Sequence, residues 1–314
     1  MSIYVAGRIN IDIVIEIDGY IKRGTKYRGK IVEIDVGGTA ANIATAIVRI
    51  DKVFSTKLLG AIGNDYKDFI FEKLGGEGID LSYVKILNCE TGKAYVFIDP
   101  EGESTIITIP GANDFYLDEY LPKIDDAKAL VLGNTTLSVA NKLLNTVPEN
   151  TILFIDPHNL WVDIHGRVKD VNNRCFYMPN ENELKIHAFV DVNDIDDVKR
   201  YAQKIRCTLI VKRGEKGVVA IHEGNIIKIN AVPLNCLGIG IASTAGCGDT
   251  FTGVFASMYI KTYDVIEALK YSTVAAALKA TKKSSRASPK IDELESFVKN
   301  VESKGLLKID ISSI

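Results

Sequence analysis

The sequence lacks the markers of several protein classes. Its five cysteines are odd in number, and no two of them form a C-x-x-C pair, so we expect neither a zinc ribbon nor a redox motif. No apolar run approaches the roughly 18 residues that a membrane span needs. The first residues, M-S-I-Y-V-A-G-R, lack the basic and long apolar regions of a signal peptide. These absences favour a reduced, soluble, cytoplasmic protein that binds no membrane.

The sequence also has little excess of either charge. Its 314 residues include 38 lysines and arginines against 40 aspartates and glutamates, a formal net charge of −2. Without a basic surplus, nucleic acid is not an expected partner. Hydrophobic residues make up 46% of the chain, enough to bury a large core. At about 150 residues per domain, the length allows one large domain, or one domain with a smaller appendage.

Two common nucleotide-binding motifs are missing or incomplete. There is no G-x-x-x-x-G-K-[ST], which excludes a P-loop. Gly238-x-Gly240 is followed at the third-glycine position by Ser243 and has no compact βαβ setting, so a Rossmann dinucleotide fold is poorly supported. The histidines are scattered without the spacing of metal ligands. We expect all four to be structural or to lie at the surface: His158, His165, His187 and His222.

Strands and helices alternate along most of the chain. β-Branched runs predict strands at 3–5, 11–17, 31–36, 58–62, 129–132, 151–155, 208–212 and 218–221. Apolar residues at helical spacing predict helices near 39–50, 65–76, 138–147, 194–205, 249–260 and 264–280. This alternation predicts an α/β fold with a parallel, doubly wound sheet and helices on both faces. In such folds the ligand lies at the carboxyl ends of the strands.

Two β-rich segments, 14–35 and 88–110, interrupt this alternation. In the second segment, residues 94–98 and 105–109 flank the turn sequence D-P-E-G at 99–102, which predicts a β-hairpin. We expect the two segments to form an inserted, mostly antiparallel lid over one edge of the sheet. The α/β core then consists of residues 1–13, 36–87 and 111–314.

The stretch from Ser243 to Gly253, S-T-A-G-C-G-D-T-F-T-G, carries the strongest chemical signal. Its apolar spacing places the start of a buried helix near Asp249. The backbone N–H groups of residues 245–248 would then point at an anion such as a phosphate. A carboxylate there repels a phosphate, which makes sense if Asp249 takes a proton from a substrate hydroxyl. Alternatively, Asp249 only caps the helix. Spacing alone leaves both interpretations open.

A second glycine-rich stretch, G-G-T-A-A-N at 37–42, also opens a helix. Asn42 in its first turn can donate and accept hydrogen bonds to a polyol, although the motif alone favours a plain turn with close helix packing. Asn10 and Asp12 share a face of the first strand. A buried, unpaired Asp12 would be costly, so a hydroxyl-rich ligand is a sensible partner. The alternative is an aspartate satisfied by backbone groups at a strand end.

Two further motifs have both a functional and a plain interpretation. Asn180 and Glu183 share a face if residues 180–187 are helical, and their oxygens could hold the waters of a Mg²⁺ ion. On its own, this motif is better explained as a simple helix start with acidic residues in the first turn. Residues 212–217, K-R-G-E-K-G, lie between two predicted strands and form either an ordinary hairpin turn or a loop around a nucleotide phosphate.

The order of these motifs along the chain is more informative than any one of them. The sequence resembles the ribokinase-like (PfkB) family of carbohydrate kinases over nearly its whole length. The matching motifs, in family order, are Gly7-x-x-Asn10-x-Asp12, Gly37-Gly38-x-x-x-Asn42, Pro110-Gly111-Ala112-Asn113, Asp156-Pro157, Asn180-x-x-Glu183, Gly214-x-x-Gly217, Gly246-x-Gly248-Asp249 and the segment from Ala275 to Pro289.

The resemblance implies a ribokinase-like three-layer α/β/α sandwich with a small β-sheet lid. It implies that Asp249 is the catalytic base and that an anion hole is formed by Gly246, Cys247 and Gly248. The acceptor sugar would be bound by Asn10, Asp12, Gly38 and Asn42. Asn180 and Glu183 would organise Mg²⁺ and the phosphates, with Glu183 nearest the metal. ATP would face Lys212, Gly214 and Gly217.

The sequence departs from the family pattern at three points. Ser243 stands where the signature usually has an aspartate that supports a monovalent-cation loop, so K⁺ activation is left open. Thr39 stands where ribokinases proper carry lysine, and no glutamate near residues 133–135 matches their ribose-contacting acid. The segments at 92–97 and 37–42 resemble archaeal nucleoside kinases of the family to a small degree.

The sequence therefore predicts a kinase that uses ATP and Mg²⁺ to phosphorylate the primary hydroxyl of a sugar or nucleoside. One alternative is a non-catalytic sugar or nucleotide sensor that keeps the fold, supported by Ser243 and Thr39. Another is a sugar dehydrogenase, which the missing Rossmann fingerprint disfavours. Because the exposed edges of a lid sheet need covering, we also expect a homodimer through the lid.

Overall fold

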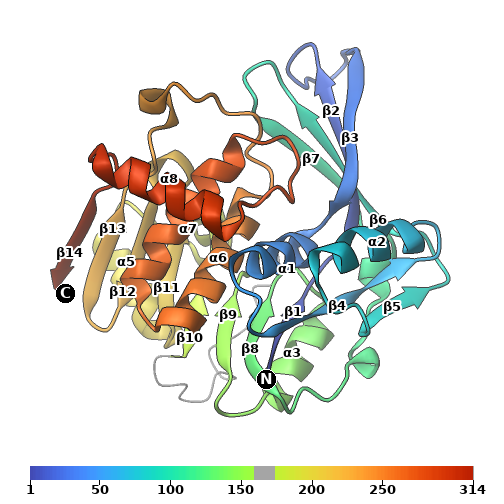
Figure 1. Ribbon diagram of the computed structural model, residues 1–314, viewed down its shortest axis with the longest axis horizontal. Helices are drawn as coiled ribbons and strands as arrows, with labels where there is room; N and C mark the ends of the chain where they lie inside the picture. The colour runs from blue at the N-terminus through green and yellow to red at the C-terminus, as the bar shows by residue number, and fades with distance from the viewer. Residues whose placement is uncertain (159–173, 314) are drawn as a thin grey trace.

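The computed structural model describes residues 1–158 and 174–313, and its larger sheet contains ten strands. These are β1 (Ser2–Ala6), β4 (Ser55–Gly63), β5 (Val84–Leu87), β8 (Ala127–Leu132), β9 (Ile152–Ile155), β10 (Cys175–Tyr177), β11 (Thr208–Lys212), β12 (Val218–His222), β13 (Asn225–Ile229) and β14 (Ile309–Ser313). They lie in the order β14-β13-β12-β11-β10-β9-β8-β1-β4-β5, as Figure 1 shows.

The sheet is mixed rather than wholly parallel. Every neighbouring pair from β5 to β11 is parallel, as the strand–helix alternation predicts. From β11 to β14 the pairs are antiparallel, and here the prediction of a parallel sheet is wrong. The reason is local: short turns at 213–217 and 223–224 join β11 to β12 and β12 to β13, and a parallel connection needs a much longer crossover.

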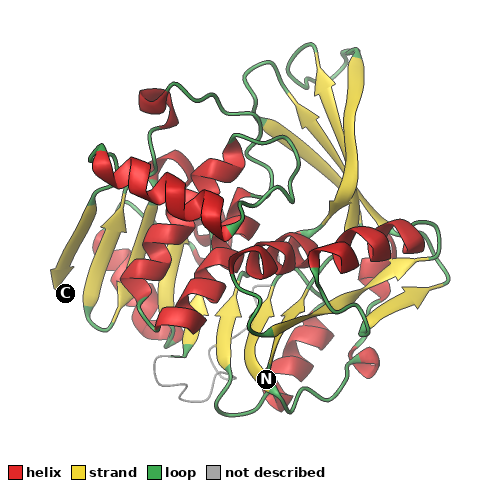
Figure 2. Cartoon of the chain, in the orientation of Figure 1, coloured by secondary structure: helices red, strands yellow, loops and turns green. Residues whose placement is uncertain are grey.

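Helices cover both faces of this sheet, which confirms the predicted α/β architecture (Figure 2). Ile3 and Val5 of β1 belong to one buried cluster, and Tyr4 and Ala6 belong to the other, because successive strand residues face opposite sides. The first cluster packs against α1 (Thr39–Ile50), α2 (Lys67–Glu77), α6 (Cys247–Thr262), α7 (Val265–Ala280) and α8 (Ile291–Ser303). The second packs against α3 (Leu137–Thr146) and α5 (Ile195–Ile205). The sequence did not predict α8, β5, β10, β13 or β14.

Short helical turns connect the remaining elements. They are η1 (Gly111–Phe115), η2 (Asp118–Tyr120), α4 (Glu181–Glu183), the π-helical turn η4 (Leu184–Ala188), η5 (Gly214–Lys216) and η6 (Leu234–Leu237).

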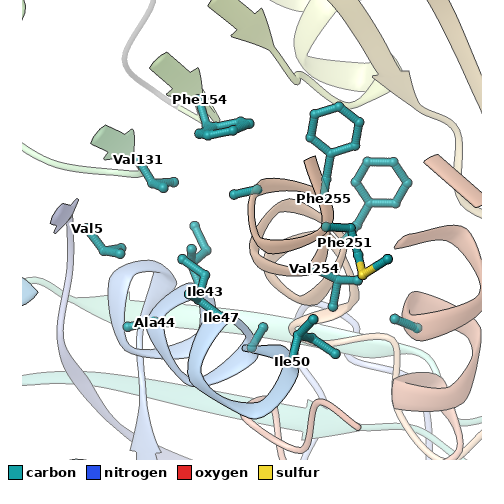
Figure 3. Close-up of a cluster of buried hydrophobic side chains, with 14 of the residues drawn as sticks. Val5, Ile43, Ala44, Ile47, Ile50, Val131, Phe154, Phe251, Val254 and Phe255 are labelled. Atoms are coloured by element: carbon teal, nitrogen blue, oxygen red, sulfur yellow. The ribbon is translucent and has the colours of Figure 1, made fainter. Parts of the chain in front are cut away.

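Helices α1 and α6 approach each other closely, and this contact positions the site. A Cβ on Gly253 of α6 would lie 2.6 Å from the Cβ of Ala46 and 2.6 Å from the carbonyl oxygen of Ile43, both on α1. Only glycine fits this crossing. Figure 3 shows Ile43 and Ile47 of α1 facing α6 in the buried cluster. The crossing brings the first turns of the two helices together.

A separate four-stranded sheet has the order β3-β2-β6-β7 and projects beyond the larger sheet (Figure 1). Its strands are β2 (Asn10–Ile17), β3 (Gly29–Gly37), β6 (Gly92–Ile98) and β7 (Ser104–Ile109). β6 and β7 form the predicted hairpin. Asn10 and Asp12 lie on β2, the second strand rather than the first, because the chain leaves β1 at Ala6. The sheet also starts earlier than residue 14, since Asn10 already pairs with Gly37 and Gly92.

Two of the five cysteines form a disulfide. Cys175 at the start of β10 is bonded to Cys207, just before β11. The expectation that all cysteines are reduced is wrong for this pair. The two cysteines are 32 residues apart, so their spacing in the sequence does not indicate that they are bonded. Cys89, Cys236 and Cys247 are free thiols. Along the described residues, no helix has the length and apolar character that crossing a membrane would require.

Candidate active site

Asp249 lies in the first turn of α6 and faces Asn42 in the first turn of α1. The Asn42 amide Nδ2 donates a 2.7 Å hydrogen bond to Oδ2 of Asp249. Helix α6 begins at Cys247 with Gly246 as its N-cap, and no side chain caps it. The alternative in which Asp249 only caps the helix is therefore wrong. This leaves a buried carboxylate held by a side chain that is distant in sequence.

The surroundings of Asp249 disfavour its charged form. The residue is only 8% exposed. Burial raises the pKa of this carboxyl above its ordinary value, while nearby His158 and the hydrogen bond from Asn42 partly oppose the shift. A carboxylate with a raised pKa is a stronger base than an ordinary aspartate.

The loop before α6 is a tight turn with a glycine at its sharpest point. Gly246 has φ 78°, and a Cβ there would lie 2.0 Å from the carbonyl oxygen of Ser285, so only glycine fits. The Ala245 amide donates to the Ser243 hydroxyl over 3.3 Å, and the Cys247 amide donates to the Thr244 carbonyl over 3.2 Å. These two amides are engaged within the turn. Burial raises the pKa of the Cys247 thiol.

Asp156 and Lys212 form a buried pair below this loop. Lys212 Nζ lies 2.5 Å from Asp156 Oδ2, which also accepts a 2.6 Å hydrogen bond from Thr252 of α6. Burial alone would raise the pKa of Asp156, but Lys212 and His158 outweigh it and hold the pKa below its usual range. A Cβ on Gly248 would lie 3.6 Å from Lys212 Nζ. The structure therefore places Lys212 directly beside the predicted anion hole.

His158 is the residue that sequence reasoning missed. Its Nε2 lies 3.5 Å from Asp156 Oδ1 and 3.8 Å from Asp249 Oδ1, and its Nδ1 lies 3.6 Å from Glu183 Oε1. Oxygen and nitrogen atoms of Asp156, His158 and Asp249 lie within 4.8 Å of one another, as a metal site requires. The sequence predicted a structural or surface role for His158, whereas the structure brings it among three carboxylates. Its place directly after Asp156-Pro157, at the carboxyl end of β9, was the available signal.

The two other histidines that the structure describes, His187 and His222, lie outside this cluster. His222 exchanges a 2.7 Å hydrogen bond with the Thr208 hydroxyl on the neighbouring strand, which fits the predicted structural role. His187 lies in η4 and is exposed. His165 falls outside the described residues.

Asn180 and Glu183 form a capping box at the start of α4. Asn180 Oδ1 accepts a 2.8 Å hydrogen bond from the Glu183 amide, and Glu183 Oε2 accepts a 2.9 Å hydrogen bond from the Asn180 amide. The plain interpretation as a helix start is thus confirmed. It does not use every oxygen, because Glu183 Oε1 faces His158 instead.

Asp12 approaches the same cluster from β2. Ser285 donates a short hydrogen bond to Asp12 Oδ2, while Oδ1 is buried without a hydrogen-bond partner among the described residues. Burial, the main cause, together with the charges of Asp249 and Asp35, raises the pKa of Asp12 to about 7. Asn42 Oδ1 is likewise buried and unpartnered. Two unused acceptors therefore lie near the Asp249 carboxylate.

Asn10 and Gly38 support the base of the four-stranded sheet. Asn10 Oδ1 accepts a 2.9 Å hydrogen bond from Asn113, whose own Oδ1 accepts from the Ile9 amide. Gly38 caps α1 with φ 90°, and a Cβ there would lie 2.6 Å from the carbonyl oxygen of Arg8. The close-packing interpretation of this glycine is thus confirmed. Sequence reasoning gave Asn113 a place in a motif but not this organising role.

Gly214 and Gly217 lie in the turn between β11 and β12. The Arg213 amide donates to the Gly217 carbonyl over 2.8 Å, and both glycines have positive φ. A Cβ on Gly217 would lie 2.0 Å from the carbonyl oxygen of Ile229. The interpretation of this motif as a hairpin turn is confirmed.

Comparison with known proteins decides the family. The pfkB family of carbohydrate kinases matches residues 2–292. The chain belongs to this family. Among curated relatives, the deoxyribokinase of Salmonella typhi is 28% identical over 313 residues, covering 95% of this chain and 99% of its own. The PfkB chain is accordingly an ATP-dependent sugar or nucleoside kinase, a phosphotransferase with an alcohol as acceptor, and the dehydrogenase alternative is wrong.

Solved structures are similar throughout the chain. The ribokinase of Thermotoga maritima is 26% identical with a TM-score of 0.79, covering 96% of this PfkB chain and all of that one. The ribokinase of Arabidopsis thaliana, solved with ribose and ATP, is 26% identical with a TM-score of 0.76, covering 95% of this chain and 98% of its own. These similarities confirm the predicted ribokinase-like α/β fold.

Proposed function

We propose that this kinase transfers the γ-phosphoryl group of ATP to the primary hydroxyl of a pentose, either 2-deoxyribose or ribose. The observation that carries the proposal is the buried Asp249 carboxylate, held by Asn42 beside the turn at residues 245–248. Similarity to a deoxyribokinase and to a ribokinase solved with ribose and ATP supports a pentose as the acceptor.

Asp249 would act as the general base. Its Oδ2 is fixed by Asn42, which leaves Oδ1 to take the proton from the sugar hydroxyl as the oxygen attacks phosphorus. The raised pKa favours this transfer, because the proton then moves to a more basic oxygen. Backbone amides of Gly246, Cys247 and Gly248 would stabilise the charge on the transferred group, worth about 3–4 kcal/mol per donor. The Cys247 amide would have to leave the Thr244 carbonyl to take part.

The acceptor sugar would bind between β2 and the first turn of α1. Asp12 Oδ1 and Asn42 Oδ1 are buried acceptors with no partner among residues 1–158 and 174–313, and sugar hydroxyls are the donors that would satisfy them. Gly38 would let the sugar approach the backbone. Asn10 would also contact the sugar, and its hydrogen bond with Asn113 would hold it in place.

The phosphate side would be served by residues at the ends of β9, β10 and β11. Mg²⁺ fits here, because Asp156 Oδ1 is buried with no hydrogen-bond partner in the described part of the chain, and Glu183 Oε1 points into the same space. Glu183 and Asp156 would hold the ion, with Asn180 fixing Glu183. When bound, Mg²⁺ offsets the negative charge of the phosphates. Lys212 would neutralise Asp156 and the incoming phosphates, and the turn with Gly214 and Gly217 would face the nucleotide.

The four-stranded sheet would be a lid formed mainly by segments 14–35 and 88–110. Its hairpin turn already reaches the loop before α6. The Ser104 hydroxyl lies 3.4 Å from that of Thr244, and a Cβ on Gly102 would lie 3.1 Å from the carbonyl oxygen of Ile241. Such contacts would help to exclude water from the phosphoryl transfer.

We also propose that two copies of the chain pair through this lid. Ile34, Ile13, Tyr95 and Ile107 are neighbours across all four strands, so they form one row on one face. The opposite face carries the buried Val14 and Val96, which pack against Ala245. The outer row ends in exposed isoleucines, with Ile34 49% and Ile107 53% exposed. A contiguous apolar face of this kind is typical of an interface.

A coupled ADP-release assay with Mg-ATP tests the function. The acceptors are 2-deoxyribose, ribose, fructose, adenosine and 5-deoxyribose, the last being a pentose without the primary hydroxyl. We expect turnover with 2-deoxyribose or ribose and none above background with 5-deoxyribose. Turnover with adenosine or fructose alone would refute the pentose assignment. Equal rates with ribose and 5-deoxyribose would refute transfer to the primary hydroxyl.

A further inference from the structure

Lys279 is a charged side chain buried in the protein interior. It lies in the last turn of α7 with 0% of its surface exposed. Among the described residues, no carboxylate lies within 4.0 Å of its ammonium group. A buried charge without a counter-ion is costly, so its remaining partners should explain why it is there.

Those partners are two backbone carbonyl oxygens. Lys279 Nζ donates to the carbonyl of Ser243 over 3.0 Å and to the carbonyl of Lys282 over 3.2 Å. Burial lowers the pKa of Lys279, and nearby negative charges, including that of Asp249, oppose this shift. Convergent carbonyl oxygens are the environment that proteins also use to hold K⁺.

The two carbonyls belong to two loops that meet behind the predicted anion hole. One loop leads through Ser243 into α6, and the other follows α7. The Ala242 and Ser243 amides both donate to the Ala280 carbonyl, over 2.8 Å and 3.1 Å. The second loop continues to Ser285, whose carbonyl oxygen fits against Gly246 with no room for a Cβ. The ammonium group thus joins the loop that shapes the anion-binding turn to the loop that supports it.

We propose that the Lys279 ammonium is a built-in monovalent cation that positions residues 243–248, so that phosphoryl transfer by this enzyme needs no K⁺ ion. Lys279 is a positioning residue: it acts through the loop and does not touch the substrates. The inference rests on the proposed function in one respect, because it assumes that this loop binds the transferred phosphate.

Two substitutions separate charge from volume. Lys279→Ala removes the ammonium and leaves a space lined by the two carbonyls, which K⁺, NH₄⁺ or a small alkylamine can enter. Lys279→Met removes the charge but fills most of the space. Lys270→Ala is the matched control on the same helix, because Lys270 pairs with Glu267 and Glu302 at the surface.

Rates are measured with Mg-ATP and the best pentose in a tetramethylammonium buffer, with Na⁺, K⁺, NH₄⁺ or ethylammonium added in turn. The wild type and K270A should be indifferent to the added cation. K279A should lose about 10²-fold in kcat, the scale of losing one anion-hole donor, and should recover most of it with K⁺, NH₄⁺ or ethylammonium. K279M should lose as much and recover nothing. Wild-type activation by K⁺, or full activity in K279M, would overturn the proposal.

Hydrogen–deuterium exchange of the peptide spanning residues 241–248 gives a readout that does not depend on turnover. In K279A its amides should exchange faster than in the wild type, and K⁺ or NH₄⁺ should slow them again. Exchange that is the same in K279A and the wild type, or faster exchange that no cation reverses, would overturn the proposal. If the wild type phosphorylates no pentose while the exchange result holds, the proposed function fails and the role of Lys279 stands.

Discussion

Asn42 donates a 2.7 Å hydrogen bond to Asp249 across 207 residues of sequence, and this contact joins the acceptor side of the site to the phosphate side. It exists because α1 and α6 cross closely at Gly253. The same hydrogen bond acts to lower the pKa of Asp249, against the larger effect of burial.

Replacing Asn42 with alanine should weaken the base at low pH. Without the amide donor the pKa of Asp249 rises further, so the carboxylate becomes protonated at a higher pH. The acid limb of the kcat–pH profile should move to higher pH. At acidic pH, kcat should fall by about tenfold or more, because the lost hydrogen bond to a charged group has a free energy that corresponds to a factor of about ten. Thr45→Ala, also buried on α1, should keep the wild-type profile. An unshifted acid limb in N42A would show that Asn42 does not govern the base.

Asp12 should make the unliganded protein less stable as the pH rises. Its pKa is about 7 when folded, against an ordinary value near 4, so between these values the native state holds a proton that the unfolded state has released. The stability from this proton is fully present below pH 4 and is lost as the pH rises through 7.

Substituting Asp12 with asparagine removes this titration. Thermal unfolding of the wild type and D12N is followed from pH 4 to pH 8 without sugar. The Tm of the wild type should fall relative to that of D12N as the pH rises. If the difference between the two Tm values stays constant over this range, Asp12 does not titrate as the structure indicates.

Gly246 should tolerate no side chain. In Gly246→Ala, positive φ and the Ser285 carbonyl oxygen 2.0 Å from the new Cβ force the turn to move, which displaces the amides beside Asp249. We expect kcat to fall by about 10²-fold and the Tm to drop. Gly240→Ala in the same loop has nothing within 4 Å of its Cβ and should behave as the wild type. Equal effects of the two substitutions would contradict the proposed role of the turn.

The lid pairing should depend on the outer row of apolar residues. Ile34→Lys or Ile107→Lys places a charge in the proposed interface and should convert a dimer to a monomer, as measured by light scattering at micromolar concentration. Ile311→Lys, an equally exposed isoleucine on β14, should leave the dimer intact. A wild type that is monomeric under these conditions would refute the pairing.

Local patterns predicted the parts of the fold that depend on nearby residues. The helix at 39–50 matches α1, and the hairpin at 94–109 matches β6 and β7, because side-chain periodicity and turn residues specify them. The turn before α6 was predicted for the same reason, and backbone geometry does require its first glycine, Gly246.

The remaining features depend on contacts between distant segments. His158 joins the carboxylate cluster only because β9 and β10 end where α6 begins, and its backbone adopts an unusual φ of 43°. The Cys175–Cys207 bond forms because β10 and β11 are adjacent in the sheet. Neither the spacing of residues in the sequence nor their type reveals which distant segments become neighbours in the fold. The site residues were therefore predicted as separate motifs and not as one cluster.

We propose above all that Asp249 takes the proton from a pentose hydroxyl. The most direct measurement compares the wild type with Asp249→Asn in the coupled assay with 2-deoxyribose and ribose, alongside Mg-ATP binding by calorimetry. In D249N we expect a loss of about 10²–10⁴-fold in kcat with nucleotide affinity nearly unchanged, because only the base is removed. A D249N variant that turns over at the wild-type rate would contradict it.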